Sequence, residues 1–340
     1  IHTDPDKYTF FETGIRGGVS VVTHRYAKAN NPQVDGYDPS KPKSNILYLD
    51  ANNLYGWAMM QYLPCGGFEW SDTSLDQVLN GNWESENGCS VEVDLEYPQE
   101  LHECHNDLPL APERVTLGYA DASGKAKSST TSPGVACEKL AGHFRPHLNY
   151  VCEARLLQYY VAKGLRVTKL HRAMTYKQAQ TLKPWIEKNT TLRSKAKNAF
   201  EKDFFKLCNN SVFGKTMQNV RTQTSYEFFT NDDKLQKRVA DPRFERCNVI
   251  GNIAGVSRIK DDVMLNKPIF MGAAILDLSK LLMFRFHYDV IRQRYGDKAR
   301  LLFTDTDSLC YHIETPDVYA DMGQMAEHFD TNDYPSEHPL

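Results

Sequence analysis

The chain has 340 residues, 41% of them hydrophobic and 24% charged, which is a globular composition sufficient for one large domain or two ordinary ones. Its formal net charge of −3 excludes a chain that is basic throughout, so any contact with nucleic acid would need a local basic surface. No apolar run is long enough to span a membrane, and no signal peptide is visible. The sequence opens with "IHTDPDKYTF", without Met, and ends with "YPSEHPL", so we expect a fragment.

The elements predicted in chain order mix strands and helices without a strict βαβ alternation. We expect a polar loop at 30–44, a short buried strand at 45–50 and a half-exposed strand at 89–97. A low-complexity, mobile excursion at 121–134 precedes a helix at 149–164, closed by Gly164, and a strand at 165–176. A mostly helical stretch at 183–215 and a long apolar helix at 271–296 follow. This mixture predicts an α+β fold.

Eight cysteines are scattered without a C-x-x-C pair, which suits a reducing, intracellular setting. Cys104 lies in "LHECHND", and Cys137 precedes His143 and His147 in "CEKLAGHFRPH". These spacings match no common zinc pattern, so we interpret the residues as ordinary thiols and imidazoles rather than metal ligands.

The stretch "LLFTDTDSLCYHI", residues 301–313, places Asp305 and Asp307 between two apolar runs that predict a hairpin. Two carboxylates at such a turn repel each other unless water or a cation surrounds them. Asp50 ends the predicted strand "NILYLD" and offers a third carboxylate. Hard oxygen ligands are those that Mg²⁺ prefers, and a pair of ions can serve phosphoryl chemistry.

The helical stretch at 183–215 supplies candidate partners for phosphate. Its expected basic face contains Lys195, Lys202 and Lys206, and its expected packing face contains Phe200, Phe204 and Leu207. The basic face leads into "NNSVFG", where small polar residues allow a close approach of the backbone.

Three stretches, in this order, resemble the polymerase core of family B DNA polymerases. The motif D-x-x-S-L-Y-P is matched by "DANNLYG", with Asn53 and Gly56 in place of Ser and Pro. The motif K-x-x-x-N-S-x-Y-G is matched by "KLCNNSVFG", and Y-x-D-T-D-S is matched by "FTDTDS", with Phe303 in place of Tyr. The whole chain is most similar to the protein-primed type of viruses and Maverick/Polinton transposons.

Shorter matches add to this resemblance. "IRGG", residues 15–18, resembles the Y-x-G-G segment that contacts the template strand, with Ile15 for Tyr. "WIEKNTTLR" resembles the finger segment whose last basic residue, here Arg193, grips the incoming triphosphate. "ILDLSK" occupies the place of a primer-template contact that ends in a basic residue, here Lys280.

The resemblance implies a role for each matched residue. The catalytic residues would be Asp50, Asp305 and Asp307, and two Mg²⁺ ions, replaceable by Mn²⁺, would be held by Asp50, Asp307 and Ala51. The deoxynucleoside triphosphate would meet Asn53, Leu54, Tyr55, Arg193, Lys206 and Asn210, with Tyr55 acting as a steric gate against ribonucleotides. Primer-template DNA would meet Gly17, Gly18, Ser211, Phe213, Gly214 and Lys280.

The resemblance also implies an organisation and a setting. Residues 1–45 would form an N-terminal segment with the Y-x-G-G-like linker, 46–182 the first part of an antiparallel palm with packed helices and insertions, 183–222 short helical fingers, and 223–340 the second part of the palm. An exonuclease domain and a thumb are not visible in the chain. The reaction would extend a primer in viral or transposon DNA replication, in the nucleus or at a viral replication site, with a terminal protein as a candidate primer and no membrane partner.

Two alternatives remain open at this point. One is an RNA-templated or ribonucleotide polymerase on a similar palm, which fits the context of "DTDS" and "NNSVFG" less well. The other is a catalytically silent scaffold that only binds nucleic acid. Three acidic side chains argue against it, because carboxylates beside phosphates do not add to the affinity for nucleic acid. Asp94 and Glu96 in "VDLEY" imitate an exonuclease motif, but they follow Asp50 in the chain, and we interpret them as the outer face of a strand.

Overall fold

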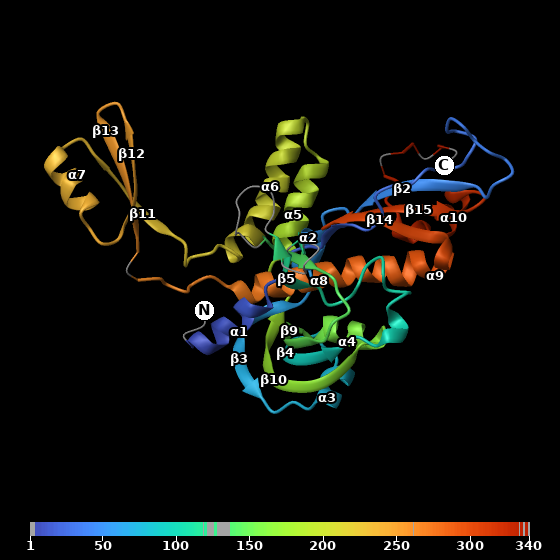
Figure 1. Ribbon diagram of the computed structural model, residues 1–340, viewed down its shortest axis with the longest axis horizontal. Helices are drawn as coiled ribbons and strands as arrows, with labels where there is room; N and C mark the ends of the chain where they lie inside the picture. The colour runs from blue at the N-terminus through green and yellow to red at the C-terminus, as the bar shows by residue number, and fades with distance from the viewer. Residues whose placement is uncertain are drawn as a thin grey trace. The chain divides into compact units, whose positions relative to one another are not determined.

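The computed structural model describes residues 4–117, 119–120, 126–127, 137–260, 262–332, 334–335 and 337–338. The chain forms two compact units, one of Gly14–Lys183 with Ala273–Leu340 and the other of Ile1–Thr13 with Pro184–Gly272 (Figure 1). Residues 223–272 thus belong to the same unit as residues 184–222, whereas the sequence predicts a boundary between 222 and 223. The four-part division itself stays a prediction, and the predicted excursion at 121–134 lies almost entirely outside the described residues.

The first sheet of the larger unit has the strand order β1-β14-β15-β2, and all its pairs are antiparallel. Its strands are β1 (Ser20–Val22), β14 (Ala299–Asp305), β15 (Ser308–Glu314) and β2 (Ser44–Asp50). Leu301, Tyr311 and Ile313 are fully buried, which explains why the two apolar runs pair around a polar turn. The predicted hairpin and the predicted strand ending at Asp50 are therefore confirmed. The prediction that this strand is buried is wrong, because Ile46 and Tyr48 are 42% and 61% exposed.

The second sheet of this unit is also antiparallel and has the order β3-β10-β4-β9. It contains β3 (Leu63–Ser71), β10 (Arg166–Ala179), β4 (Asn87–Glu96) and β9 (His147–Glu153). The strands β5 (Glu113–Leu117) and β8 (Cys137–Ala141) form a separate two-stranded ribbon. The strand predicted at 165–176 is confirmed as part of β10. With antiparallel sheets and helices that do not alternate as βαβ units, the α+β fold class is confirmed as well.

Two predictions in this sheet need correction. Residues 147–153 form β9, and only α4 (Ala154–Ala162) is helical, so the helix predicted at 149–164 is wrong in its first third. The β-forming residues Tyr150 and Cys152 pair with β4, and this pairing overrides the helical pattern. The strand predicted at 89–97 exists, but its first residues Cys89 and Ser90 are buried, so it is half-exposed only further along.

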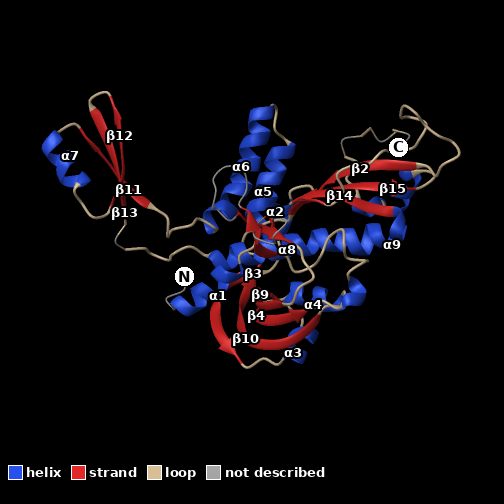
Figure 2. Ribbon diagram, in the orientation of Figure 1, coloured by secondary structure: helices blue, strands red, loops and turns tan. Residues whose placement is uncertain are grey.

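A long helix lies between the two sheets of the larger unit (Figure 2). It comprises α8 (Ile269–Arg285), a π-helical segment (Phe286–Ile291) and α9 (Arg292–Tyr295), which confirms the long helix predicted at 271–296. On one side, the Nδ1 atom of His287 lies 3.0 Å from the Tyr311 hydroxyl in β15. On the other side, Asp277 accepts a hydrogen bond of 2.9 Å from the Glu153 backbone N–H in β9. Among the described residues, no helix is both long and apolar enough to cross a membrane.

The smaller unit contains a helical pair and a three-stranded antiparallel sheet. Its elements are α1 (Pro5–Gly14), α5 (Lys183–Ser194), α6 (Ala199–Thr216), β11 (Thr224–Phe229), α7 (Asp232–Val239), β12 (Phe244–Ile250) and β13 (Ile253–Ile259). The Trp185 indole N–H donates to the Cys208 carbonyl and so links α5 to α6. The helical content predicted for 183–215 is confirmed.

Two details of that prediction are wrong. Lys195 follows the end of α5 and precedes α6, so it does not share a helical face with Lys202 and Lys206. The expected packing face of α6 is exposed, with Phe200 at 78%, Phe204 at 50% and Leu207 at 64% of full exposure. The apolar spacing was correct, but helical periodicity alone does not say whether a face is covered.

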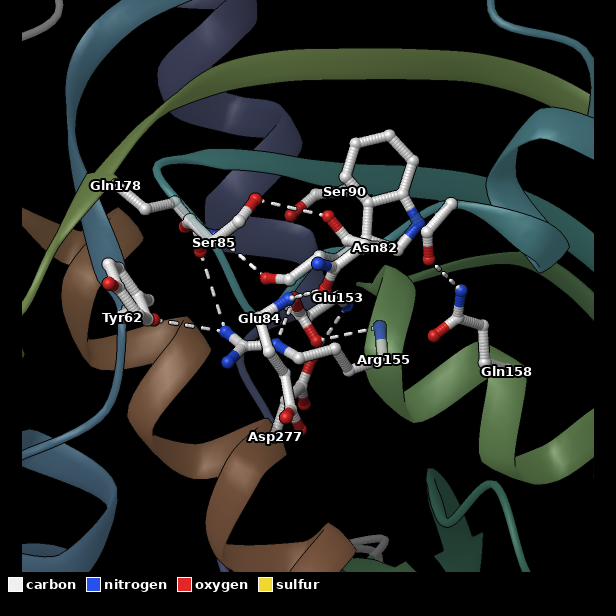
Figure 3. Close-up of polar contacts among 12 residues, drawn as sticks. Tyr62, Asn82, Glu84, Ser85, Ser90, Glu153, Arg155, Gln158, Gln178 and Asp277 are labelled. Carbon is white, nitrogen blue, oxygen red and sulfur yellow. Dashed lines mark hydrogen bonds and ion pairs between the residues drawn. The ribbon is translucent and has the colours of Figure 1, made fainter.

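A buried network of charges joins the sheet β3-β10-β4-β9 to the helices (Figure 3). The Glu153 carboxylate accepts a 2.7 Å bond from the Arg155 guanidinium and also caps α4 through the Arg155 backbone N–H. Arg155 donates in addition to the Tyr62 carbonyl at 3.0 Å. Because both side chains are buried, each charge depends on the other for compensation.

Replacing Arg155 with Met should therefore destabilise the fold strongly, because it leaves the Glu153 carboxylate buried without its cation. Breaking such a pair typically costs about 3–5 kcal/mol. Burial already raises the pKa of Glu153 against the opposing effect of Arg155, and loss of Arg155 raises this pKa further. A raised folded-state pKa gives stability that is present at low pH and lost as the pH rises, so the deficit should be largest at neutral pH and shrink toward pH 5.

Chemical denaturation of the variant at several pH values measures this effect. The matched control is Arg166→Met, which breaks an exposed pair with Glu100 and should cost about 0–1 kcal/mol. Equal losses in the two variants, or a deficit in Arg155→Met that grows at low pH, would contradict the assignment.

Candidate active site

A row of four polar side chains crosses the sheet β1-β14-β15-β2. Ser20 is directly opposite Asp305, Asp305 is opposite Ser308, and Ser308 is opposite Asp50. Residues opposite each other in antiparallel strands project from the same face, so these side chains share one face of the sheet. The row brings Asp50 and Asp305 together from opposite ends of the chain.

Asp307 is the hairpin aspartate whose backbone contacts the residue after Asp50. The N–H of Ala51, the residue after Asp50, donates to the Asp307 carbonyl at 2.7 Å. Asp305 is two strands away from Asp50, which corresponds to about 10 Å between backbones. The geometry thus distinguishes Asp50 and Asp307, which are neighbours, from Asp305, which lies further along the row.

The turn between β14 and β15 has an unusual backbone. Thr306 has φ 60°, and the Asp307 N–H donates to the Asp305 carbonyl at 2.7 Å, which is the pattern of a positive-φ γ-turn. For a β-branched residue this conformation is strained, and such strain is common at functional sites. The turn is held from outside by a 2.9 Å bond from the Thr306 N–H to the Val19 carbonyl.

Gly18 is required by the packing of this turn. A Cβ at position 18 would lie 2.4 Å from the Thr306 Cγ2 atom, whereas a Cβ at Gly17 would meet nothing within 4 Å. The glycine therefore allows the chain before β1 to pass directly against the hairpin. Contact of Gly17 and Gly18 with DNA stays a prediction.

The helix α2 (Leu54–Met59) begins immediately after Asp50 and Ala51. Its N-cap residue, Asn53, adopts φ 52°, and its carbonyl accepts the Trp57 N–H at 2.9 Å. A Cβ at Gly56 would lie only 1.9 Å from the Asn53 Nδ2 atom. The two departures from the family motif, Asn53 and Gly56, are thus in contact, and the glycine makes room for the asparagine.

Tyr55 lies within the electrostatic reach of Asp307. Burial raises the pKa of the Tyr55 hydroxyl, and the charge of Asp307 raises this pKa further. Leu54, by contrast, is buried. Of the first-motif residues, Tyr55 is therefore the side chain that accompanies the carboxylates.

The electrostatics of the row favour a cation. Asp50 and Asp305 are exposed, and among the described residues neither forms an ion pair with a lysine, arginine or histidine. The Ser20 hydroxyl donates to the Asp305 carboxylate, which orients that carboxylate without neutralising it. A set of carboxylate oxygens at a solvent-exposed strand end fits the ligand preference of Mg²⁺ or Mn²⁺.

The remaining predicted nucleotide-binding residues belong to the smaller unit. Arg193 is an exposed residue in the last turn of α5, and Lys206 and Asn210 are exposed on α6. Lys206, Asn210, Phe213 and Gly214 follow one another at helical spacings, so they lie along one face of α6, and Ser211 is exposed beside them. Their contacts with nucleotide or DNA stay predictions.

Lys280 has a structural role that the sequence did not indicate. Its side chain is only 4% exposed, and its ammonium donates to the carbonyls of Arg16 and Leu276, each at 2.9 Å. Asp277 lies 3.3 Å from the same ammonium, and burial lowers the pKa of this lysine. Lys280 thus anchors the "IRGG" segment to α8, while its contact with DNA stays a prediction.

Asp94 makes protein contacts typical of a structural side chain. Its carboxylate accepts the Asn149 N–H at 2.8 Å and lies 2.8 Å from the His171 Nε2 atom. Val93 and Leu95, its neighbours in β4, point into the core. The interpretation of Asp94 and Glu96 as the outer face of a strand is confirmed.

The sequence analysis did not identify Ser20 and Ser308 in the row or Thr306 in the turn beside it. Ser20 is 285 residues from Asp305, so no local pattern could pair them. Thr306 and Ser308 lie inside the "DTDS" motif, but the strain of the first and the bridging position of the second depend on sheet register.

No model of a known protein family matches the chain, and no curated protein matches it by sequence. Among solved structures, Phi29 DNA polymerase with primer-template DNA is similar over 94% of this chain, with 14% identity and a TM-score of 0.47. The ternary complex of Phi29 DNA polymerase with primer-template DNA and incoming nucleotides gives 94% coverage, 16% identity and a TM-score of 0.48. The chain spans less than half of these polymerase chains, 45% and 46% respectively.

Substituting Gly18 with Ala should strain the hairpin turn, because the added methyl group collides with Thr306. Overpacking of this kind costs about 1–3 kcal/mol, whereas Gly17→Ala should stay within about 0.5 kcal/mol. Thr306→Gly should rescue Gly18→Ala, because it removes the colliding side chain and suits the positive φ. A double-mutant cycle of unfolding free energies measures the coupling, and additive effects would show that the two residues do not touch.

Proposed function

We propose that this chain carries the catalytic site of a template-directed DNA polymerase, which transfers deoxynucleotides to a primer 3′-hydroxyl. The observation that supports this most strongly is the row that joins Asp50 to the hairpin of Asp305 and Asp307. The two segments match separate motifs of family B polymerases, and the sheet register brings them together. A binding module has no need for carboxylates gathered beside phosphate.

The carboxylates of Asp50 and Asp307 would hold the divalent ions. The backbone of Ala51, whose N–H donates to the Asp307 carbonyl, would lie at the same site. When bound, two such ions supply charge stabilisation for the attacking hydroxyl and for the leaving pyrophosphate. Asp305, oriented by the Ser20 hydroxyl, would add negative charge that keeps the ions in this part of the sheet. The strained turn at Thr306 fixes the direction of both hairpin carboxylates before substrate arrives.

The start of α2 would receive the triphosphate and the sugar. Backbone groups at Asn53 and Leu54 are positioned by the left-handed cap, and Tyr55 lies within the electrostatic reach of Asp307. Arg193 and Lys206 are exposed cations suited to the triphosphate, the first as a bidentate donor and the second as a point charge. Asn210, Ser211, Phe213 and Gly214 would meet the nascent pair and the template.

The finer classification rests on the motif resemblance alone. It favours the protein-primed type of viruses and transposons, in which a terminal protein serves as primer. Primer extension on a defined template, with and without Mg²⁺, tests the general proposal directly.

Replacing Asp50 or Asp307 with Asn should abolish primer extension while the fold and DNA binding are retained. Loss of a metal-holding carboxylate removes several kcal/mol of transition-state stabilisation, which is about a thousandfold or more in rate. Asp297→Asn is the matched control, because this aspartate is fully exposed, at 101%, and belongs to the same unit. Extension rates and DNA-binding anisotropy should be measured on the same preparations.

Near-normal extension by either site variant would show that the metal assignment is wrong. Loss of DNA binding together with extension would instead point to a scaffold role for the aspartates.

Tyr55→Val should admit ribonucleotides much more readily and leave deoxynucleotide incorporation largely intact. The ring of Tyr55 is expected to collide with a 2′-hydroxyl, and discrimination of this kind comes from a clash with the wrong substrate. Tyr55→Phe is the matched control, because it retains the ring and removes only the hydroxyl near Asp307. Single-nucleotide incorporation with both sugars gives the ratio, and an unchanged ratio in Tyr55→Val would overturn the steric-gate role.

A further inference from the structure

A second group of potential metal ligands lies on strands other than those of the aspartate row. Glu113 begins β5, His147 begins β9, and His143 lies between β8 and β9. The ligand atoms of these three residues all lie within 4.8 Å of one another. A single carboxylate oxygen, Oε2 of Glu113, lies 3.0 Å from Nε2 of His143 and 2.9 Å from Nδ1 of His147.

The protein leaves this cluster with unsatisfied polar atoms. His147 is fully buried, at 0% exposure. Its Nδ1 atom lies 2.9 Å from the Glu113 oxygen, whereas its Nε2 atom has no hydrogen-bond partner among the described residues. A buried imidazole nitrogen without a hydrogen-bond partner is unfavourable, and a bound ion is one way in which a native protein satisfies it.

The distances suit a small cation bound by all three residues. Zinc binds imidazole nitrogen and carboxylate oxygen at about 2.0–2.1 Å, which places neighbouring ligand atoms of a tetrahedral site about 3.3 Å apart. The separations of 3.0 and 2.9 Å to the Glu113 oxygen are close to this value. The two rings are now nearly parallel, at 13°, so binding requires one of them to rotate until both in-plane lone pairs meet at one point.

We propose that Glu113, His143 and His147 form a zinc-binding site. Two imidazoles and one carboxylate favour zinc over magnesium, because magnesium prefers an all-oxygen shell. Three protein ligands leave the fourth tetrahedral position for water. The ion would tie the β5-β8 ribbon to β9, closing the chain between Glu113 and His143 and stabilising this part of the larger unit.

The proposed site differs from the one considered from the sequence, which combined His143 and His147 with Cys104 and Cys137. Cys104 is exposed, and its thiol lies against the Leu101 carbonyl. The missing third ligand is Glu113, which no spacing rule could select because it lies 30 residues before His143.

Zinc content and zinc-dependent stability test the proposal without reference to polymerase activity. The protein is stripped with chelator, loaded with Zn²⁺ alone, desalted and measured by metal analysis, and its Tm is compared with and without Zn²⁺. Wild type should retain about one equivalent, with a raised Tm, in the presence of excess Mg²⁺. His143→Ala and Glu113→Gln should lose the bound zinc and the rise in Tm, and the side chains at both positions are partly exposed, at 15% and 22%.

Two variants serve as matched controls. His171→Ala removes a half-buried histidine that pairs with Asp94, and Cys104→Ser removes an exposed thiol, so both should bind zinc like wild type. The proposal is overturned if wild type retains no zinc, if His143→Ala and Glu113→Gln retain it, or if only Cys104→Ser loses it.

Discussion

The register of four antiparallel strands is the constraint on which the candidate active site depends. Because Ser308 pairs with Asp305 on one side and with Asp50 on the other, carboxylates from distant motifs reach one face of one sheet. A shift of one residue in β15 would turn Ser308 to the opposite face and separate the row. The buried residues Tyr311 and Ile313 of β15 hold this register, since the same slip would turn them away from the core.

The turn that carries Asp305 and Asp307 is supported by a chain of contacts that begins in α8. The buried Lys280 ammonium holds the Arg16 carbonyl, and the Arg16 guanidinium lies 3.8 Å from the centre of the Tyr150 ring. Two residues later, Gly18 packs against Thr306, and Val19 accepts its N–H. The "IRGG" segment therefore connects α8 to the hairpin of β14 and β15.

The sequence predicts those parts of the site that are local. The hairpin, the strand ending at Asp50 and the helices α5 and α6 follow from short apolar patterns and were found where expected. The sequence does not predict which residues the strand register brings together, such as Ser20 and Asp305. It also does not predict that Asn53 and Gly56, the two substitutions in the first motif, contact each other. Periodicity also does not reveal which residues are buried. The sequence therefore did not predict that Lys280 is buried or that the apolar face of α6 is exposed.

The most direct test of the central claim is a crystal structure of the protein with primer-template DNA, a deoxynucleoside triphosphate and Mn²⁺, in which anomalous scattering locates the metal. We expect the strongest anomalous peaks between the carboxylates of Asp50 and Asp307, with the triphosphate beside Asn53 and Leu54. The absence of a metal peak at Asp50 and Asp307 when the nucleotide is well ordered would contradict the account.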